Sequence, residues 1–355
     1  MVTISLCMIV KNEEAVLGRC LNSVKDAVDE IIIVDTGSTD QTKEIAGQFT
    51  SKVYDFEWCE DFSQARNFSF AKATMDYQMW LDADDVVVDS ERLKLMALKQ
   101  TLRDIDIVTM KYHTHFDADG HPVLTSTRER LFKTAKGYRW QDQIHEYVPM
   151  YGNIFDSDVT IHHQKEGSSG DRNIRIYERL VQQGHVLSPR SIYYFARELM
   201  DWQRYGEAAE YFNKFLHEGQ GWYEDNIAAC FNLSRCYNQL QMTEQVLPIL
   251  LKSFTYDTPR AEICCQIGYY YKNLADYQKA VFWFELALGL TKNSRGFILN
   301  DYWDYIPSIE LCLCYYQMGD LAKAYQYHLL SAQYKPHNNS VIYNQAFFAK
   351  IGLAD

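Results

Sequence analysis

The sequence lacks any long apolar run. No hydrophobic stretch within its 355 residues approaches the ~20 residues that a membrane-spanning helix requires, so we expect no transmembrane segment. The apolar start, residues 1–10, has no basic residues before it and no small-residue cleavage site after it. This pattern argues against a secretory leader and predicts a first β-strand.

Paired cysteines are also missing. The nine cysteines are odd in number and scattered, with no CxxC spacing, so the sequence offers neither a disulfide framework nor a zinc site. Most of them lie in apolar helical patterns, where a free thiol behaves as a small buried hydrophobe. This usage indicates a reducing compartment, and we expect a cytoplasmic protein.

Basic residues are not in excess. The chain has 35 Lys and Arg against 47 Asp and Glu, a net charge of −12, which argues against a broad binding surface for nucleic acid or anionic lipid. Hydrophobic residues make up 47% and charged residues 23%, a globular composition. Because single hydrophobic cores stop growing near ~250–300 residues, we expect two domains.

The first half alternates β-rich runs with amphipathic helical patterns. We expect strands at residues 5–10, 31–34, 78–81 and 107–110, and a helix at residues 15–28. The run Ile31–Val34 is wholly β-branched, which is typical of a strand buried on both faces. The alternation predicts an α/β fold with a largely parallel sheet in residues 1–170.

From about residue 171 the pattern is helical only, and it repeats. An aromatic or apolar position recurs in the first helix of each pair, at Leu199, Tyr237, Tyr271 and Tyr315. A small or β-branched position recurs in the second helix, at Ala208, Val246, Ala280 and Ala324. The spacing is close to the 34 residues of a tetratricopeptide helix pair. We therefore predict about four helical hairpins stacked as an all-α solenoid over residues 171–355.

Two acidic turns follow predicted strands. Asp35–Asp40 comes directly after the buried run, where a carboxylate can accept hydrogen bonds from a base or ribose; a turn that only caps the next helix is the alternative. Asp82, Asp84 and Asp85 follow the strand at residues 78–81. Carboxylates crowded in this way repel one another unless a cation lies among them, and oxygen ligands suit Mg²⁺ or Mn²⁺.

Four segments together resemble glycosyltransferase family 2. They are Lys11–Glu14, Val34–Asp40, Ala65–Asn67 and Leu81–Asp85, in that order, and the resemblance covers roughly residues 1–165. It implies a GT-A (Rossmann-like) fold, an inverting mechanism and a divalent metal. With the helical repeats, the chain is similar to bacterial peptide S-glycosyltransferases of the sublancin type.

The resemblance implies a role for several residues. Asp35 matches the nucleoside-binding aspartate, Asp82 the ribose end of the aspartate motif, and Asp84 the metal ligand, with Asp85 as a second ligand. Arg66 matches a residue near the base and diphosphate, with a structural salt bridge as the alternative. The remaining nucleotide-sugar-binding candidates are Glu13, Asn67 and Arg130; for Arg130, neutralising leaving-group charge competes with a structural role.

A second group of residues suits the acceptor side. An inverting transfer needs one carboxylate that takes the acceptor proton, and we expect Glu146 to be that base, with Asp142 as the runner-up. His145 is expected to orient Glu146 or to contact the diphosphate, with a core histidine as the alternative. His163 is expected to reach the metal or the diphosphate, His162 to be its structural neighbour, and Lys165 is a weaker candidate.

The sequence thus predicts an inverting, metal-dependent glycosyltransferase. It would transfer a hexose or N-acetylhexosamine from a UDP-sugar to a peptide Cys or Ser side chain held partly by the repeats, and the helical domain would be available for homo-oligomer formation. A transferase acting on a cell-envelope glycan or lipid-linked sugar is one alternative. A non-catalytic tetratricopeptide scaffold with a decayed transferase domain is the other.

Overall fold

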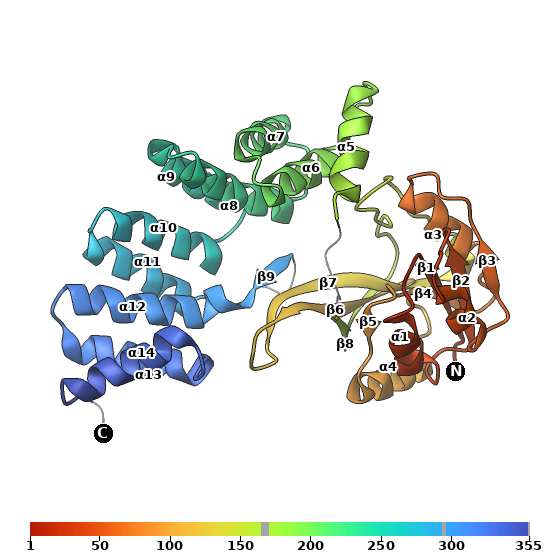
Figure 1. Ribbon diagram of the computed structural model, residues 1–355, viewed down its shortest axis with the longest axis horizontal. Coiled ribbons are helices and arrows are strands. Elements are labelled where there is room, and N and C mark those ends of the chain that lie inside the picture. Colours follow the sequence, from red (N-terminus) through yellow and green to blue (C-terminus); the bar gives the residue numbers. More distant parts are fainter. Residues whose placement is uncertain (165–169, 293–295, 354–355) are drawn as a thin grey trace. The chain divides into compact units, whose positions relative to one another are not determined.

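The chain forms two compact units in the computed structural model (Figure 1), which describes residues 1–164, 170–292 and 296–353. Residues 1–115 and 125–185 form the first unit, and residues 116–124 and 186–355 form the second. An α/β unit followed by a helical repeat unit was predicted, and this fold class is confirmed. No described helix is long and apolar enough to cross a membrane. Lys165 lies outside the described residues.

The first unit is built on a mixed sheet with the strand order β3-β2-β1-β4-β7-β6-β8-β5. The strands are β1 (Ile4–Val10), β2 (Glu30–Asp35), β3 (Val53–Asp55), β4 (Tyr77–Trp80), β5 (Asp85–Val86), β6 (Ile107–Phe116), β7 (Pro122–Lys133) and β8 (Ile154–His163). Strands β1 to β4 pair in parallel, whereas β7 runs antiparallel to β4 and β5 antiparallel to β8. The parallel strands therefore end at one common edge.

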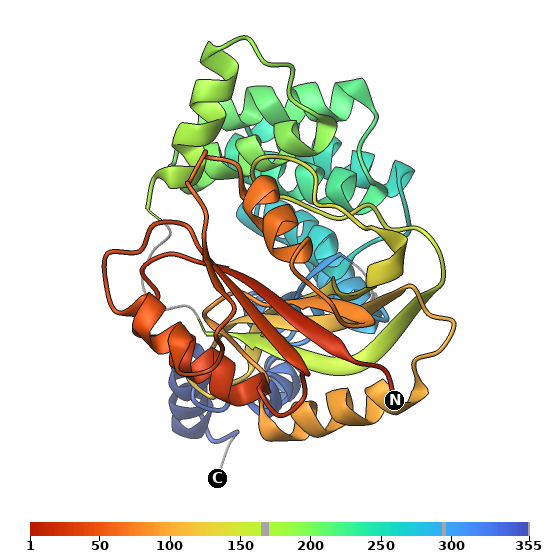
Figure 2. The ribbon, with the colours of Figure 1, turned by 90° about the vertical axis from the view of Figure 1, so that its right-hand side faces the viewer.

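Helices cover both faces of this sheet (Figure 2). They are α1 (Leu17–Val24), α2 (Thr42–Gly47), α3 (Phe62–Phe70) and α4 (Asp89–Thr101). The first unit also contains a 3-10 turn, η1 (Thr134–Lys136), and helix α5 (Arg172–Gln182). Strand β1 alternates its side chains: Leu6 and Met8 join the core beneath α1 and α4, while Cys7 joins the core beneath α3. Burial on both faces explains why the strands read as continuous apolar runs.

The second unit is an array of helices. These are α6 (Pro189–Asp201), α7 (Tyr205–Glu218), α8 (Tyr223–Gln239), α9 (Thr243–Lys252), α10 (Ala261–Asn273), α11 (Tyr277–Gly289), α12 (Tyr305–Gln317), α13 (Leu321–Tyr334) and α14 (Asn339–Lys350), with η2 (Ser253–Thr255), β9 (Phe297–Leu299) and η3 (Asn300–Trp303) between them. Helices α6 to α13 pair in chain order as four hairpins. Ala208, Val246, Ala280 and Ala324 are all buried, as expected of the small position at which two helices approach closely.

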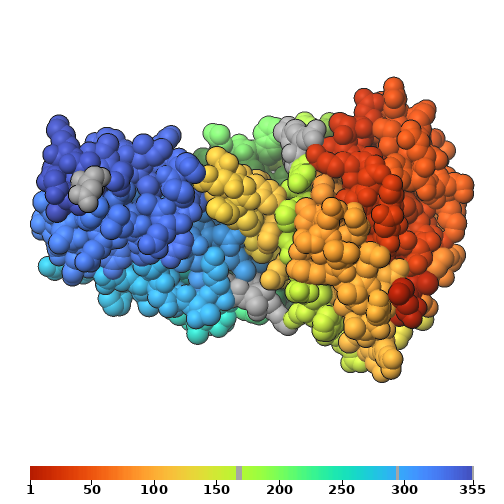
Figure 3. All heavy atoms as spheres, turned by 90° about the horizontal axis from the view of Figure 1, so that it is seen from below, coloured from red at the N-terminus to blue at the C-terminus, as the bar shows by residue number. Residues whose placement is uncertain are grey.

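The turn between β6 and β7 belongs to the second unit. Within that unit, His337 Nδ1 lies 2.8 Å from Asp119 Oδ1, and Lys335 Nζ lies 3.2 Å from Asp117 Oδ2. Figure 3 shows this yellow turn against the blue helices at the end of the chain. β9 pairs with β7, the strand that follows this turn.

Candidate functional site

Three polar segments meet where the parallel strands end. Strands β1, β2 and β4 are neighbours in parallel register, with Val10 opposite Asp35. The segments that follow them therefore emerge at the same edge, as in other open α/β sheets that bind ligands there. This edge brings together the turns that begin at Lys11, Asp35 and Leu81.

Asp35 lies at the end of β2 and is only 2% exposed. Its Oδ1 accepts hydrogen bonds from the backbone N–H groups of Gly37 and Ser38, both at 2.9 Å. Gly37 has φ 102°, a conformation that is strained for any side chain. Oδ2 is buried and has no hydrogen-bond partner among the described residues. A buried acceptor of this kind favours a ligand that brings a donor, because leaving it unpaired costs about 1–3 kcal/mol.

The turn after β1 is tied to the turn after β2. Asn12 has φ 56°; its Oδ1 accepts a hydrogen bond from the Thr39 backbone at 2.8 Å, and its own N–H donates to Ser38 Oγ at 2.9 Å. This anchoring directs the next residue, Glu13, toward the aspartate motif. Burial and then the charges of Asp84 and Asp82 raise the pKa of Glu13 to about 7. The edge of the sheet thus concentrates negative charge.

Arg66 joins two carboxylates that lie far apart in the sequence. It lies on α3, whose first turn is capped by Asp61 Oδ1 accepting from Gln64 N at 3.0 Å. Its Nε donates to Glu146 Oε1 at 2.5 Å and its Nη2 to Asp82 Oδ1 at 2.8 Å. Although burial opposes both charges, the ion pair keeps the pKa of Asp82 well below its usual range and raises that of Arg66.

Two indole rings hold Arg66 in place. Its guanidinium lies 4.9 Å from the ring centres of both Trp80 and Trp140, a distance at which a cation is attracted to an aromatic face. These rings also pack edge to face on each other at 5.2 Å. The side chain therefore has little freedom to leave Glu146 and Asp82.

Glu146 is presented by a turn with unusual backbone geometry. Asn67 anchors the turn by exchanging two hydrogen bonds with the Trp140 backbone, at 2.9 and 3.0 Å. Asp142 and His145 have φ values of 67° and 51°, and the His145 ring stacks on Tyr177 of α5 at 6.1 Å. The Glu146 side chain is 12% exposed, and the described residues offer its Oε2 no hydrogen bond.

Asp85 is the most deeply buried carboxylate of the site. Its Oδ1 accepts from Tyr112 Oη at 2.8 Å, and its Oδ2 accepts from Arg130 Nη1 and from the Asp82 backbone N–H, both at 3.0 Å. Arg130 is itself fully buried, with its guanidinium 3.8 Å from the Trp80 ring centre and 4.4 Å from that of Tyr112. Arg130 and Asp85 thus form an ion pair excluded from solvent.

Asp84, Asp85 and His163 could hold a metal ion. One ligand atom from each lies within 4.8 Å of the others, and His163 Nδ1 is 3.2 Å from Asp84 Oδ1 and 3.1 Å from Asp85 Oδ1. Burial disfavours a charged ring, but the two carboxylates outweigh it and raise the pKa of His163 to about 10. Two carboxylate oxygens and one imidazole nitrogen form a donor set that suits Mn²⁺ and also accommodates Mg²⁺.

The structure brings most of the predicted residues together. Glu13, Arg66, Asp82, Asp84, Asp85, Arg130, Glu146 and His163 are linked by the interactions above, with Asn67 as an anchor and Asp35 in the adjoining turn. The His162 ring lies instead beside that of His113, at 5.5 Å. Sequence reasoning missed Tyr112, Trp80 and Trp140; Tyr112 shares the buried face of β6 with Val108 and Met110, so its sequence pattern carries no signal of a role in the site.

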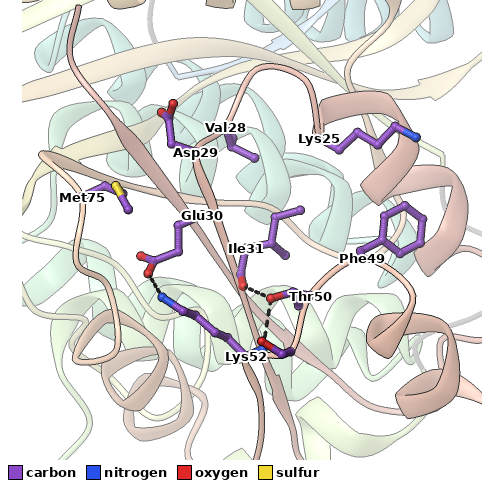
Figure 4. Close-up of a pocket in the computed structure, with 10 residues that line it drawn as sticks. Lys25, Val28, Asp29, Glu30, Ile31, Phe49, Thr50, Lys52 and Met75 are labelled. Carbon is purple, nitrogen blue, oxygen red and sulfur yellow. Dashed lines mark hydrogen bonds and ion pairs between the residues drawn. The ribbon is translucent and has the colours of Figure 1, made fainter.

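A separate hollow lies at the opposite end of these strands (Figure 4). It measures about 350 Å³ and is lined by Lys25, Val28, Asp29, Glu30, Ile31, Phe49, Thr50, Ser51, Lys52 and Met75. The ion pair of Lys52 with Glu30 crosses it, and Thr50 Oγ1 donates to the Ile31 carbonyl at 2.8 Å. Two lysines and two acids line the hollow, so its lining carries no net formal charge.

Comparisons with known families agree with the two units. Residues 5–159 match the model of "Glycosyl transferase family 2", and residues 261–294 match a tetratricopeptide repeat. A TPR repeat-containing protein of Synechococcus elongatus is 38% identical over 148 residues, which are 42% of this chain and 36% of that protein. The SPbeta prophage-derived glycosyltransferase SunS of Bacillus subtilis is 29% identical over 230 residues, 61% of this chain and 53% of that protein. The chain thus spans about half or less of the length of these two relatives.

Solved structures give weaker likenesses. A thermophilic TPR protein of Thermus thermophilus covers 51% of this chain and 90% of its own, with 19% identity and a TM-score of 0.38. Glucosyl-3-phosphoglycerate synthase of Mycobacterium tuberculosis, solved with Mn²⁺ and UDP-glucose, covers 53% and 81%, with 15% identity and a TM-score of 0.35.

Proposed function

We propose, from the premise that residues 5–159 form a glycosyl transferase family 2 domain, that this chain is an inverting, metal-dependent glycosyltransferase. Its donor would be a UDP-sugar bound by residues 1–170, and its acceptor a peptide Cys or Ser side chain recognised with the help of residues 171–355. All nine cysteines are free and eight are buried, which is consistent with a reducing, cytoplasmic setting. Self-association through the helices has no supporting observation among the described residues.

The proposal rests on how the three acids of the aspartate motif are paired. Asp82 is paired with Arg66, and Asp85 with Arg130 and Tyr112. Among the described residues, the Asp84 carboxylate has His163 as its partner and no cation of Lys or Arg. A divalent ion would therefore compensate Asp84 most, with His163 and Asp85 beside it; when bound, it would stabilise charge on the departing diphosphate.

The donor site follows from the neighbouring turn. Asp35 Oδ2 is oriented as an acceptor without a partner and would accept a hydrogen bond from the uracil or ribose. Asp82 would face the ribose, since Arg66 fixes its position. Glu13 closes this edge of the site. These residues hold the donor and orient its anomeric carbon, but they transfer no proton.

Glu146 would serve as the base. Arg66 occupies Oε1, which leaves Oε2 for the hydroxyl or thiol of the acceptor. Arg66, held between the two indole rings, keeps this carboxylate in one orientation, so its proton-accepting oxygen is set before the acceptor arrives. His145, stacked on Tyr177, supports the turn that carries Glu146.

The test measures UDP released from a panel of UDP-sugars with Mn²⁺, with EDTA as the metal-free arm. Asp84→Ala should abolish the Mn²⁺ dependence of UDP binding by calorimetry and leave the fold intact by circular dichroism. Asp89→Ala is the matched control, because the Asp89 side chain is an 88% exposed acid on the following helix. Unchanged UDP affinity and Mn²⁺ dependence in Asp84→Ala would refute the metal assignment. No turnover of any UDP-sugar would refute the enzyme proposal and favour the scaffold alternative.

A further inference from the structure

The first helices of three successive hairpins present equivalent residues. The residues six and two positions before Leu199, Tyr237 and Tyr271 form a row of six side chains. They are Tyr193 and Arg197 on α6, Phe231 and Arg235 on α8, and Cys265 and Tyr269 on α10. Residues four apart lie on the same face of a helix. Because the register repeats, the row runs across the three helices; Tyr193, Phe231 and Cys265 are its buried members, whereas Arg197, Arg235 and Tyr269 are more exposed.

A segment of the same chain lies on this row. Arg197 stacks over the ring of Phe297 in β9, with 5.0 Å between the guanidinium and the ring centre. Phe231 packs edge to face on Tyr302 of η3 at 5.8 Å. Cys265 Sγ lies 3.7 Å from the Tyr302 carbonyl oxygen. One short segment therefore contacts all three helices of the row.

The fit of the segment is specific rather than incidental. Gln266 Nε2 donates to Tyr302 Oη at 3.3 Å, and burial raises the pKa of that phenol. A Cβ at Gly296 would come within 2.8 Å of Glu224 Oε2, so the backbone approaches α8 closely where the segment begins. Asn300 Nδ2 donates to the Pro122 carbonyl at 2.7 Å, which fixes the middle of the segment.

We propose that this row is a binding site for short, aromatic-bearing peptides, and that residues 297–302, which form β9 and the start of η3, are its ligand within the same molecule. The bound segment defines the ligand chemistry: one aromatic ring lies against Arg197, and a second, five positions later in the chain, lies against Phe231. Another peptide with this pattern would bind by displacing it. That the acceptor peptide of the glycosyl transfer binds to this row rests on the proposed function. Peptide binding to the row does not depend on it.

Displacement has a calculable effect. A ligand attached by a short connection acts at an effective concentration on the order of 1 mM. For a peptide that binds the open row with a dissociation constant near ~100 µM, competition by the attached segment would weaken binding about tenfold. The intact chain should therefore bind such a peptide poorly, and a chain with a weakened segment should bind it well.

The probe is a synthetic, fluorescein-labelled peptide with the sequence of residues 297–303, and binding is followed by fluorescence anisotropy without any donor. Phe297→Ala/Tyr302→Ala removes both rings and should bind the peptide about tenfold more tightly than the intact chain. The matched control is Phe282→Ala/Tyr343→Ala, which removes the same two ring types from positions that are 60% and 73% exposed; it should bind like the intact chain.

A further substitution places the peptide on the row. Adding Gln266→Ala to the released variant should weaken binding about fivefold, the effect of one lost hydrogen bond. If the double variant does not fold by circular dichroism, Phe297→Ala alone replaces it, since Tyr302 then keeps its contacts; a smaller gain in the same direction is expected.

Three results would overturn the proposal: equal binding by the intact and released chains, binding by neither, or an equal gain in the control. Failure of the proposed transferase is distinguishable, because it would appear in UDP release and leave the anisotropy result unchanged.

Discussion

Replacing Arg130 with Met should destabilise the first unit severely. The Arg130 and Asp85 side chains are both 0% exposed and 3.0 Å apart. Met has nearly the same length and is apolar, so the space between Trp80 and Tyr112 stays filled while Asp85 loses its cation. Removing one partner of a buried ion pair typically costs about 3–5 kcal/mol. This is a large share of a domain stability of ~5–15 kcal/mol.

A double substitution isolates the charge. Asp85→Asn keeps an acceptor for Tyr112 Oη and removes the carboxylate that Arg130→Met leaves unpaired. The loss in the double variant should therefore be smaller than the sum of the two single losses, because the residues are in direct contact and their effects couple. Arg128→Met is the matched control: this cation also lies over the Trp80 ring, at 5.4 Å, but its side chain is 27% exposed. It should lose no more than about 1 kcal/mol.

Urea unfolding, followed by tryptophan fluorescence and circular dichroism, gives the free energies. If Arg130→Met stays within 1 kcal/mol of the parent, or if the double variant shows the plain sum, the ion pair does not stabilise the unit as argued. UDP binding then separates the two roles weighed for Arg130. A variant that keeps its stability and loses UDP affinity would make Arg130 a donor-binding residue.

Three further predictions concern the acids of the first unit. Glu146→Gln should lower turnover on a hydroxyl acceptor by about 10²–10⁴-fold and leave UDP affinity unchanged. The loss should be smaller on a thiol acceptor, because a thiol already ionises near its pKa of ~8.5. A kcat near that of the parent on the hydroxyl acceptor would exclude Glu146 as the base. Asp35→Ala should weaken UDP binding by about 1.5–3 kcal/mol, the value of a hydrogen bond to a charged group, and unchanged calorimetry would remove it from the donor site. Burial opposes the charge of Glu30, but hydrogen bonds from Lys52, Ser5 and Thr74 outweigh it and lower its pKa to about 2. The ionised Glu30 therefore stabilises the fold above the unfolded-state pKa of 4.5, and this stabilisation is lost as the pH falls toward 2. The difference in unfolding free energy between Glu30→Gln and the parent should shrink over that interval. A difference that does not change with pH would contradict this.

Much of the fold could be predicted because local patterns agree with tertiary burial. The apolar run at residues 5–10 is the strand Ile4–Val10, and the helical pattern at 15–28 contains the helix Leu17–Val24. The longest repeat interval, between Tyr271 and Tyr315, contains β9 and η3. This insertion was visible as an irregular spacing, but its position on the row could not be inferred, since contacts between distant segments leave no local pattern.

The same limit applies to the site. The acidic turns were visible because their residues are adjacent in the sequence and follow apolar strands. The connection of Arg66 to Asp82 and Glu146 spans 16 and 80 residues and depends on how α3 packs against the sheet. Likewise, Tyr112 reads as one more apolar position of a strand, and only the fold shows that its hydroxyl donates to Asp85.

Three of the eight described non-glycine residues with left-handed backbone lie beside the site's acids. Asn12 precedes Glu13, while Asp142 and His145 shape the turn that carries Glu146. Each such residue costs on the order of 1–3 kcal/mol and persists only where its surroundings impose it. Here the surroundings are identifiable: Ser38 and Thr39 bind Asn12, and the paired backbones of Gln141 and Tyr147 close the other turn at 2.8 and 3.1 Å. The backbone that carries both acids is therefore fixed by the protein rather than by a ligand, as electrostatic preorganisation requires.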